Sequence, residues 1–150
     1  MQILRATSEY ANDLTQISIL AKSHWEYPQA WIQFWTPSLT LTAEYIDTHE
    51  VWMMVSEGRP LAFYSFDENE EGFWLDNLWV SPAYMGQGIG RSLFQHALER
   101  CKTLRISTLK IEADPNARNF YERMGAHQVG EHSTEIQGEP RILPVMEINL

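Results

Sequence analysis

The sequence predicts a fold with a mixed α/β sheet. Two observations predict it. The hydrophobic pattern changes several times between a helical and a strand period, and Gly, Pro and polar runs separate the resulting segments. The 150 residues are 44% hydrophobic and 12% aromatic, which favours one folded domain over residues 1–150. The predicted order of elements is β-α-α-β-β-β-α-β-α-β-β.

The first third of the chain is predicted to be mostly helical. A short strand at residues 2–6 opens the chain. A helix follows from Tyr10, because apolar residues then recur at steps of three and four. An aromatic stretch at residues 24–35 is interrupted by Pro28, and a further short helix begins after Thr42, which caps it. The apolar stripe of the first helix consists of Leu14, Ile17, Leu20 and Ala21.

The rest of the chain is richer in predicted strands. Residues 51–80 are β-branched and aromatic, and the polar run Asp67–Gly72 interrupts them, which predicts three antiparallel strands. The later predicted elements are a helix that extends to Leu104, a strand at 108–113, a short helix with Asn116 as N-cap and Gly125 at its end, and strands at 127–136 and 141–150.

Charge and cysteine content exclude several classes of protein. Eleven Lys and Arg against twenty Asp and Glu give a formal charge of −9, whereas nucleic acid and anionic lipid both require a basic face. We therefore expect no nucleic acid and no membrane as partner. Cys101 is the only cysteine, and no leader-like apolar run opens the chain, so a cytoplasmic location is expected. The five histidines have no ligand spacing, and no metal is expected.

Gly86, Gly88 and Gly90 stand at alternate positions between a predicted strand and a predicted helix. Free backbone N–H groups at a helix N-terminus attract anions, phosphate above all, and Arg91 follows directly. The spacing G-x-G-x-G fits neither the dinucleotide fingerprint nor the Walker loop. The loop alone therefore predicts a phosphate site, and the competing interpretation is a tight turn with close packing.

The segment VSPAYMGQGIGRSLFQHAL resembles the acyl-CoA-binding motif of the GNAT superfamily of N-acetyltransferases, [QR]-x-x-G-x-[GA]. Met85 departs from that motif by replacing its first Gln or Arg, and Gln87 is the substitute two places on. In the family the loop amides hold the CoA pyrophosphate. The resemblance implies that acetyl-CoA is bound by Met85, Gly86, Gln87, Gly88, Ile89, Gly90 and Arg91.

The later segment ADPNARNFYERMGA resembles a second motif of the same family. The resemblance implies that Asn116 helps to place the pantetheine arm and that Tyr121 is the general acid near the CoA sulfur. It also implies that backbone groups of one strand line the thioester, at Leu78, Trp79 and Val80. The fold it implies has a central, mostly antiparallel, twisted sheet of six to seven strands with helices on both faces. A homodimer through the last strands is a further implication.

Several residues are candidates for the catalytic acid and base. Tyr121 lies on an apolar helical stripe, so the hydrophobic periodicity favours a place in the core. Only the resemblance to the family favours a role as general acid. The base stays open between Asp76 and Glu112, on two strands expected to flank the thioester, and His24. Trp74 stands where the family commonly has a glutamate.

The expected reaction is acetyl transfer to a primary amine of a small molecule, by direct attack in a ternary complex. The aromatic stretch is the expected acceptor-binding region; its named residues are His24, Trp25, Tyr27 and Trp31. The alternatives are that these rings only pack the helices, that the protein is a non-catalytic acyl-CoA sensor or interaction module, or that it acetylates protein N-termini or lysines. A nucleotide-dependent enzyme is disfavoured because no P-loop lysine is present.

Overall fold

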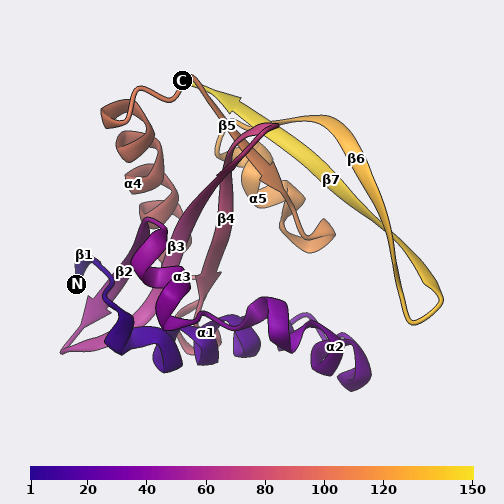
Figure 1. Cartoon of the computed structure of the whole chain (residues 1–150), viewed down its shortest axis with the longest axis horizontal. Coiled ribbons are helices and arrows are strands. Elements are labelled where there is room, and N and C mark those ends of the chain that lie inside the picture. The colour runs from indigo at the N-terminus through magenta and orange to yellow at the C-terminus, as the bar shows by residue number, and fades with distance from the viewer. The chain divides into compact units, whose positions relative to one another are not determined.

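The computed structural model describes residues 1–150, and Figure 1 labels their helices and strands. The seven-stranded sheet has the order β1-β2-β3-β4-β5-β7-β6. The β4–β5 pair is parallel, while β1–β2, β2–β3, β5–β7 and β6–β7 are antiparallel. This arrangement confirms the predicted mostly antiparallel sheet. The strands are β1 Gln2–Arg5, β2 Val51–Ser56, β3 Arg59–Asn69, β4 Gly72–Val80, β5 Thr108–Glu112, β6 His127–Ile136 and β7 Glu139–Asn149.

Three α-helices precede β2, one more than the predicted order contains. The aromatic stretch continues as a helix because Pro28 stands at its N-cap, ahead of the first turn, where a missing N–H costs nothing. The predicted helix to Leu104 ends one residue earlier, at Thr103. None of the helices is long and apolar enough to cross a membrane. The helices are α1 Ala11–Ser23, α2 Gln29–Leu39, α3 Ala43–Thr48, α4 Ile89–Thr103 and α5 Arg118–Arg123.

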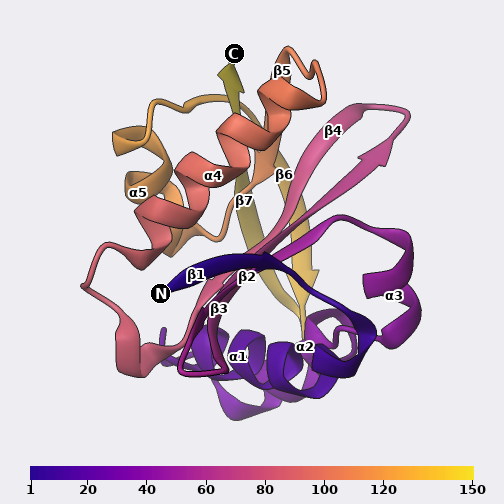
Figure 2. The same cartoon turned by 90° about the vertical axis from the view of Figure 1, so that its left-hand side faces the viewer.

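The chain divides into two compact units. The first comprises Met1–Phe66 and Asn77–Phe94, and the second comprises Asp67–Asp76 and Gln95–Leu150. In the first unit β1 lies beside β2, as Figure 2 shows. Thr42 caps α3 as predicted, because its Oγ1 accepts a hydrogen bond from Tyr45 N at 3.0 Å. The core of this unit contains Ala6, Leu14, Ile17, Leu41, Ile46, Val51, Met53 and Phe63.

In the second unit β6 and β7 form a long hairpin (Figure 1). β7 also pairs with β5, and a short 3-10 turn at Pro115–Ala117 leads into α5. The prediction that Asn116 is the N-cap is wrong. Asp114 caps this turn, because Pro115 occupies the first position and the side chain before it accepts the hydrogen bond of Asn116 N.

Candidate active site

The glycine loop lies in the first unit, between the 3-10 turn at Pro82–Tyr84 and α4. Gly86 and Gly88 each have φ of +80°, a conformation that L side chains rarely adopt. A Cβ atom at either glycine would meet no atom within 4 Å. These two glycines are therefore required by the backbone conformation, and the space beside them is open. Gly90 and Arg91 instead belong to the first turn of α4, after the buried Ile89.

The strand that leads into this loop is held by a polar network. Trp79 Nε1 donates to Asn77 Oδ1 at 3.0 Å, and Asn77 Nδ2 donates to Ser65 Oγ at 2.9 Å. Ser65 Oγ is also 2.9 Å from Tyr45 OH, and Ser65 is fully buried. Buried polar groups that are satisfied in this way fix a single arrangement of the strand. Leu78 and Val80, the other strand residues expected at the thioester, are half-buried beside it.

Only some residues of the predicted acceptor region belong to one cluster of aromatic rings. Tyr27, Trp31 and Trp35 contact one another with centroid separations of 5.0–6.0 Å. Lys22 Nζ lies 4.3 Å from the centroid of Trp35 and 5.0 Å from that of Tyr27. These rings therefore surround a cation of the chain itself, an arrangement that stabilises the charged amine. His24 and Trp25 are exposed at the end of α1, where their rings contact each other.

A cavity in the second unit brings together both of the carboxylates proposed as bases. It has a volume of about 340 Å³. Because Trp74 pairs with Lys110 in the parallel β4–β5 ladder, Asp76 and Glu112 lie two residues further along neighbouring strands, on the same face. The lining consists of Asp67, Asn69, Glu71, Trp74, Leu75, Asp76 and Glu112, four of them carboxylates.

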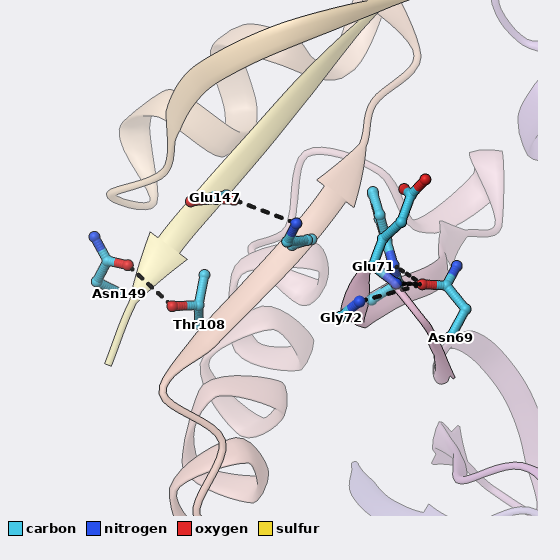
Figure 3. A network of polar contacts seen from close by, with 8 residues as sticks. Asn69, Glu71, Gly72, Thr108, Glu147 and Asn149 are labelled. Carbon is cyan, nitrogen blue, oxygen red and sulfur yellow. Dashed lines mark hydrogen bonds and ion pairs between the residues drawn. The ribbon is translucent and has the colours of Figure 1, made fainter.

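Asn69 lies in the lining of this cavity and holds the turn between β3 and β4. Figure 3 shows its contacts with Glu71 and Gly72. Asn69 Oδ1 accepts hydrogen bonds from Glu71 N at 2.8 Å and from Gly72 N at 3.2 Å. It also accepts one from Trp74 Nε1 at 3.0 Å. Lys110 Nζ lies 5.5 Å from the centroid of the Trp74 indole and 3.7 Å from Glu147 Oε2. The hairpin turn and the indole are thus fixed beside the carboxylates.

Glu112 has a partner that the sequence does not reveal. His132 Nδ1 lies 3.1 Å from Glu112 Oε1, with the two side chains 55% and 40% exposed. No local spacing connects these residues, which are 20 positions apart and on different strands. Only a prediction of how β5 and β6 pair with β7, residue by residue, would have brought these two residues together from the sequence.

Asp114 connects the Asn116–Tyr121 segment to β7. Its Oδ1 accepts from Asn116 N at 2.9 Å and from Asn116 Nδ2 at 3.0 Å. Its Oδ2 accepts from Arg141 Nη2 at 3.2 Å, and both ionic side chains are close to 10% exposed. Burial first, and the charge of Asp114 second, raise the pKa of Tyr121 above its ordinary value. Tyr121 is therefore a neutral phenol throughout the physiological range.

This pKa shift predicts how stability depends on alkaline pH. The unfolded chain ionises Tyr121 near pH 10, whereas the folded chain keeps the proton to higher pH. The free energy of unfolding should therefore fall as the pH rises above about 10, by up to about 1.4 kcal/mol per pH unit from this group. Urea denaturation at several alkaline pH values measures the slope. Tyr121→Phe should flatten it, and equal slopes in both proteins would contradict the assignment.

The structure distributes the predicted site residues over both units. The loop residues 85–91, the strand residues 78–80 and the aromatic residues lie in the first unit. The second unit contains Asp76, Glu112, Asn116 and Tyr121. Within it, the structure brings Asp76 and Glu112 to one cavity and links Asn116 to Asp114. No group of three or more His, Cys, Asp and Glu side chains is arranged to hold a metal ion. Cys101 is buried in α4 and is not part of a disulfide.

The sequence profile of the acetyltransferase (GNAT) family matches residues 13–126. The chain therefore belongs to the GNAT family of acetyltransferases, as its two motifs predict. It is 27% identical over 111 residues to the peptidyl-lysine N-acetyltransferase YiaC of Escherichia coli, covering 73% of each chain. It is 29% identical over 101 residues to the peptidyl-lysine N-acetyltransferase YjaB of Salmonella typhimurium, covering 67% of this chain and 66% of that one.

Solved structures agree with the fold. A GCN5-related N-acetyltransferase from Rhodopseudomonas palustris has a TM-score of 0.82 at 19% identity, covering 99% of this chain and 95% of that one. The PaiA N-acetyltransferase of Thermoplasma acidophilum, solved in complex with coenzyme A, has a TM-score of 0.78 at 15% identity, covering 99% and 98%. At these identities the likeness establishes the shared fold.

Proposed function

We propose that this acetyltransferase transfers the acetyl group of acetyl-CoA to a primary amine, and that the acceptor class is the lysine side chain of proteins. The observation that carries the acceptor proposal is the acidic cavity that contains Asp76 and Glu112. Its carboxylates favour a cationic alkylamine, and the Trp74 indole supplies an aromatic wall. Two relatives that are named peptidyl-lysine N-acetyltransferases support the same class.

The glycine loop is proposed to hold the donor. Open space beside Gly86 and Gly88 fits a pyrophosphate close to the backbone, and the start of α4 offers free N–H groups. Arg91 is exposed in the first turn and is proposed to add a charged contact. Acetyl-CoA, when bound, supplies the activated thioester. The complex of PaiA with coenzyme A supports this donor.

Tyr121 is proposed to donate a hydrogen bond to the leaving sulfur. Because its pKa is raised, it stays protonated, and a hydrogen bond that strengthens as the thiolate develops stabilises the transition state. Asn116 is proposed to contact the pantetheine arm from the same short segment.

The small-molecule acceptor, the cytoplasmic location and the homodimer stay predictions.

A two-part experiment tests the proposed function. Calorimetric titration with acetyl-CoA, with ATP and NAD as controls, measures donor binding. Release of free CoA thiol is then followed with three acceptors: a peptide with one lysine and blocked ends, a peptide with only a free N-terminus, and spermidine. Turnover with the lysine peptide alone supports the proposal. Faster turnover with spermidine would favour a small-molecule acceptor, and donor binding with no turnover would favour the sensor alternative.

Substitution of Gly88 by Val should weaken donor binding. At φ of +80° a side chain costs about 1–2 kcal/mol, so the loop must rearrange or bear the strain. We expect the Kd for acetyl-CoA to rise about tenfold, because about 1.4 kcal/mol corresponds to that factor. Gly58→Val is the matched control, since Gly58 has φ of +75° and equally open surroundings in the β2–β3 turn. It should lower stability and leave the Kd unchanged, and equal losses of binding in both variants would contradict a loop-specific role.

A further inference from the structure

We propose that Glu112 and His132 form a proton relay, in which Glu112 takes the proton of the acceptor ammonium in the cavity and His132 passes it to solvent. The inference rests on the proposed function and names a residue for a step that the sequence leaves open. It assigns Glu112 as the base and His132 as its positioning and proton-accepting partner.

The sheet register places the pair. Glu112 on β5 is opposite Val145 on β7, and His132 on β6 is opposite Leu143 on the same strand. Opposed residues share a face of a sheet, and residues two apart on one strand do so too. Glu112, Val145, Leu143 and His132 therefore lie on one face, where the imidazole reaches the carboxylate across β7. Nδ1 and Oε1 are 3.1 Å apart.

The two ends of the pair face different surroundings. Glu112 lines the cavity together with Asp76, whereas His132 is not among the lining residues and its side chain is 55% exposed. A proton taken up by Glu112 in the cavity thus has a hydrogen-bonded partner with access to water. Lys110, two residues from Glu112 on β5 and on the same face, has a carboxylate partner of its own, because its Nζ lies 3.7 Å from Glu147 Oε2.

The proton and bond changes balance. The ammonium gives one proton to Glu112, Glu112 gives it to Nδ1 of the His132 tautomer that is protonated at Nε2, and Nε2 releases a proton to water. The free amine then forms a bond to the acetyl carbon as the carbon–sulfur bond breaks. The nitrogen loses its second proton and the thiolate takes up one, so the products are the amide and the thiol of CoA. Imidazole holds a proton more strongly than a carboxylate in model compounds, so a histidine relay makes the first transfer less unfavourable.

A polar contact this exposed contributes little to stability, so its removal should leave the fold intact. The test compares His132→Ala, Glu112→Gln, the double variant and His127→Ala. His127 is the matched control, an exposed histidine on the same strand. Turnover of the blocked lysine peptide is followed by release of CoA thiol, and the Kd for acetyl-CoA is measured by calorimetry for each protein.

We expect His132→Ala to lower kcat about tenfold with an unchanged Kd for acetyl-CoA. This loss is smaller than the roughly hundredfold or more that a general acid or base itself contributes, because Glu112 remains. Imidazole added to the buffer should restore much of the loss, which a merely structural role would not allow. The double variant should be no slower than Glu112→Gln, because both residues serve one step. His127→Ala should behave as wild type. Wild-type turnover by His132→Ala, or no rescue by imidazole, would overturn the relay.

A measurement without turnover separates this inference from the proposed function. If the wild type binds acetyl-CoA but acetylates no lysine peptide, the proposed acceptor fails. The relay is then read from the NMR signal of the His132 ring during titration with n-butylamine, a simple alkylammonium. A shift that Glu112→Gln abolishes supports it, and a signal that does not move overturns it.

Discussion

Replacement of Tyr121 by Phe is expected to lower kcat about a hundredfold while the Kd for acetyl-CoA stays nearly unchanged. The variant removes only the hydroxyl. The ring is 7% exposed and contacts Phe120 with a centroid separation of 5.2 Å, so its packing remains. The loss should therefore appear in the chemical step and not in binding, as expected for an interaction made in the transition state.

The control for this prediction is Tyr10→Phe, which removes the hydroxyl of a half-buried tyrosine at the start of α1. It should leave kcat unchanged. Steady-state kinetics with the blocked lysine peptide give both values. If Tyr121→Phe turns over like the wild type, Tyr121 is a core residue, as its helical stripe indicates when read alone, and the proton donor must be another group.

Substitution of Arg141 by Leu is expected to lower the free energy of unfolding by about 3 kcal/mol. Arg141 and Asp114 form an ion pair with side chains 11% and 10% exposed. Removal of Arg141 takes the guanidinium away from the poorly hydrated carboxylate of Asp114. The free-energy cost of burying that charge without the guanidinium exceeds what the ion pair contributed to stability. Urea unfolding, read as a change in midpoint at constant m-value, measures the effect.

The matched control is Arg118→Gln, which breaks the ion pair between Arg118 and Glu122 on α5. These two side chains are 51% and 43% exposed, and their atoms are 2.7 Å apart. Such an exposed pair contributes about 0.3–0.5 kcal/mol, so the loss should be small. Similar losses in both variants would show that the burial of Asp114 has no special effect on stability.

Local sequence patterns predicted most of the fold. β5 and β7 alternate and β2 is apolar almost throughout. α1 buries Leu14, Ile17 and Ala21 at helical spacing, as its stripe indicates, whereas Leu20 beside them is exposed. Thr42 caps α3 through a contact three residues away, and the glycine loop departs from ordinary backbone at positions where only glycine is relaxed. Each of these features depends on residues that are close in sequence, so the sequence alone was enough to predict it.

The cap of the segment that bears Tyr121 shows how a local signal can be misread. Asn116 is a good capping residue, but Pro115 directly before it occupies the first position of a helical turn. Asp114 therefore caps the 3-10 turn ahead of α5, and the same carboxylate reaches Arg141, 27 residues away. The Asp-Pro pair indicated the cap in the sequence, whereas the partner on β7 is visible only in the structure.

The sequence by itself determined the class of the protein, the glycine loop and the candidates Asp76, Glu112 and Tyr121. Only the tertiary structure placed Asp76 and Glu112 at one cavity and put His132 against Glu112. The physical reason is strand register. A shift of one residue turns every side chain of a strand to the opposite face, and hydrogen bonds to neighbouring strands set that register.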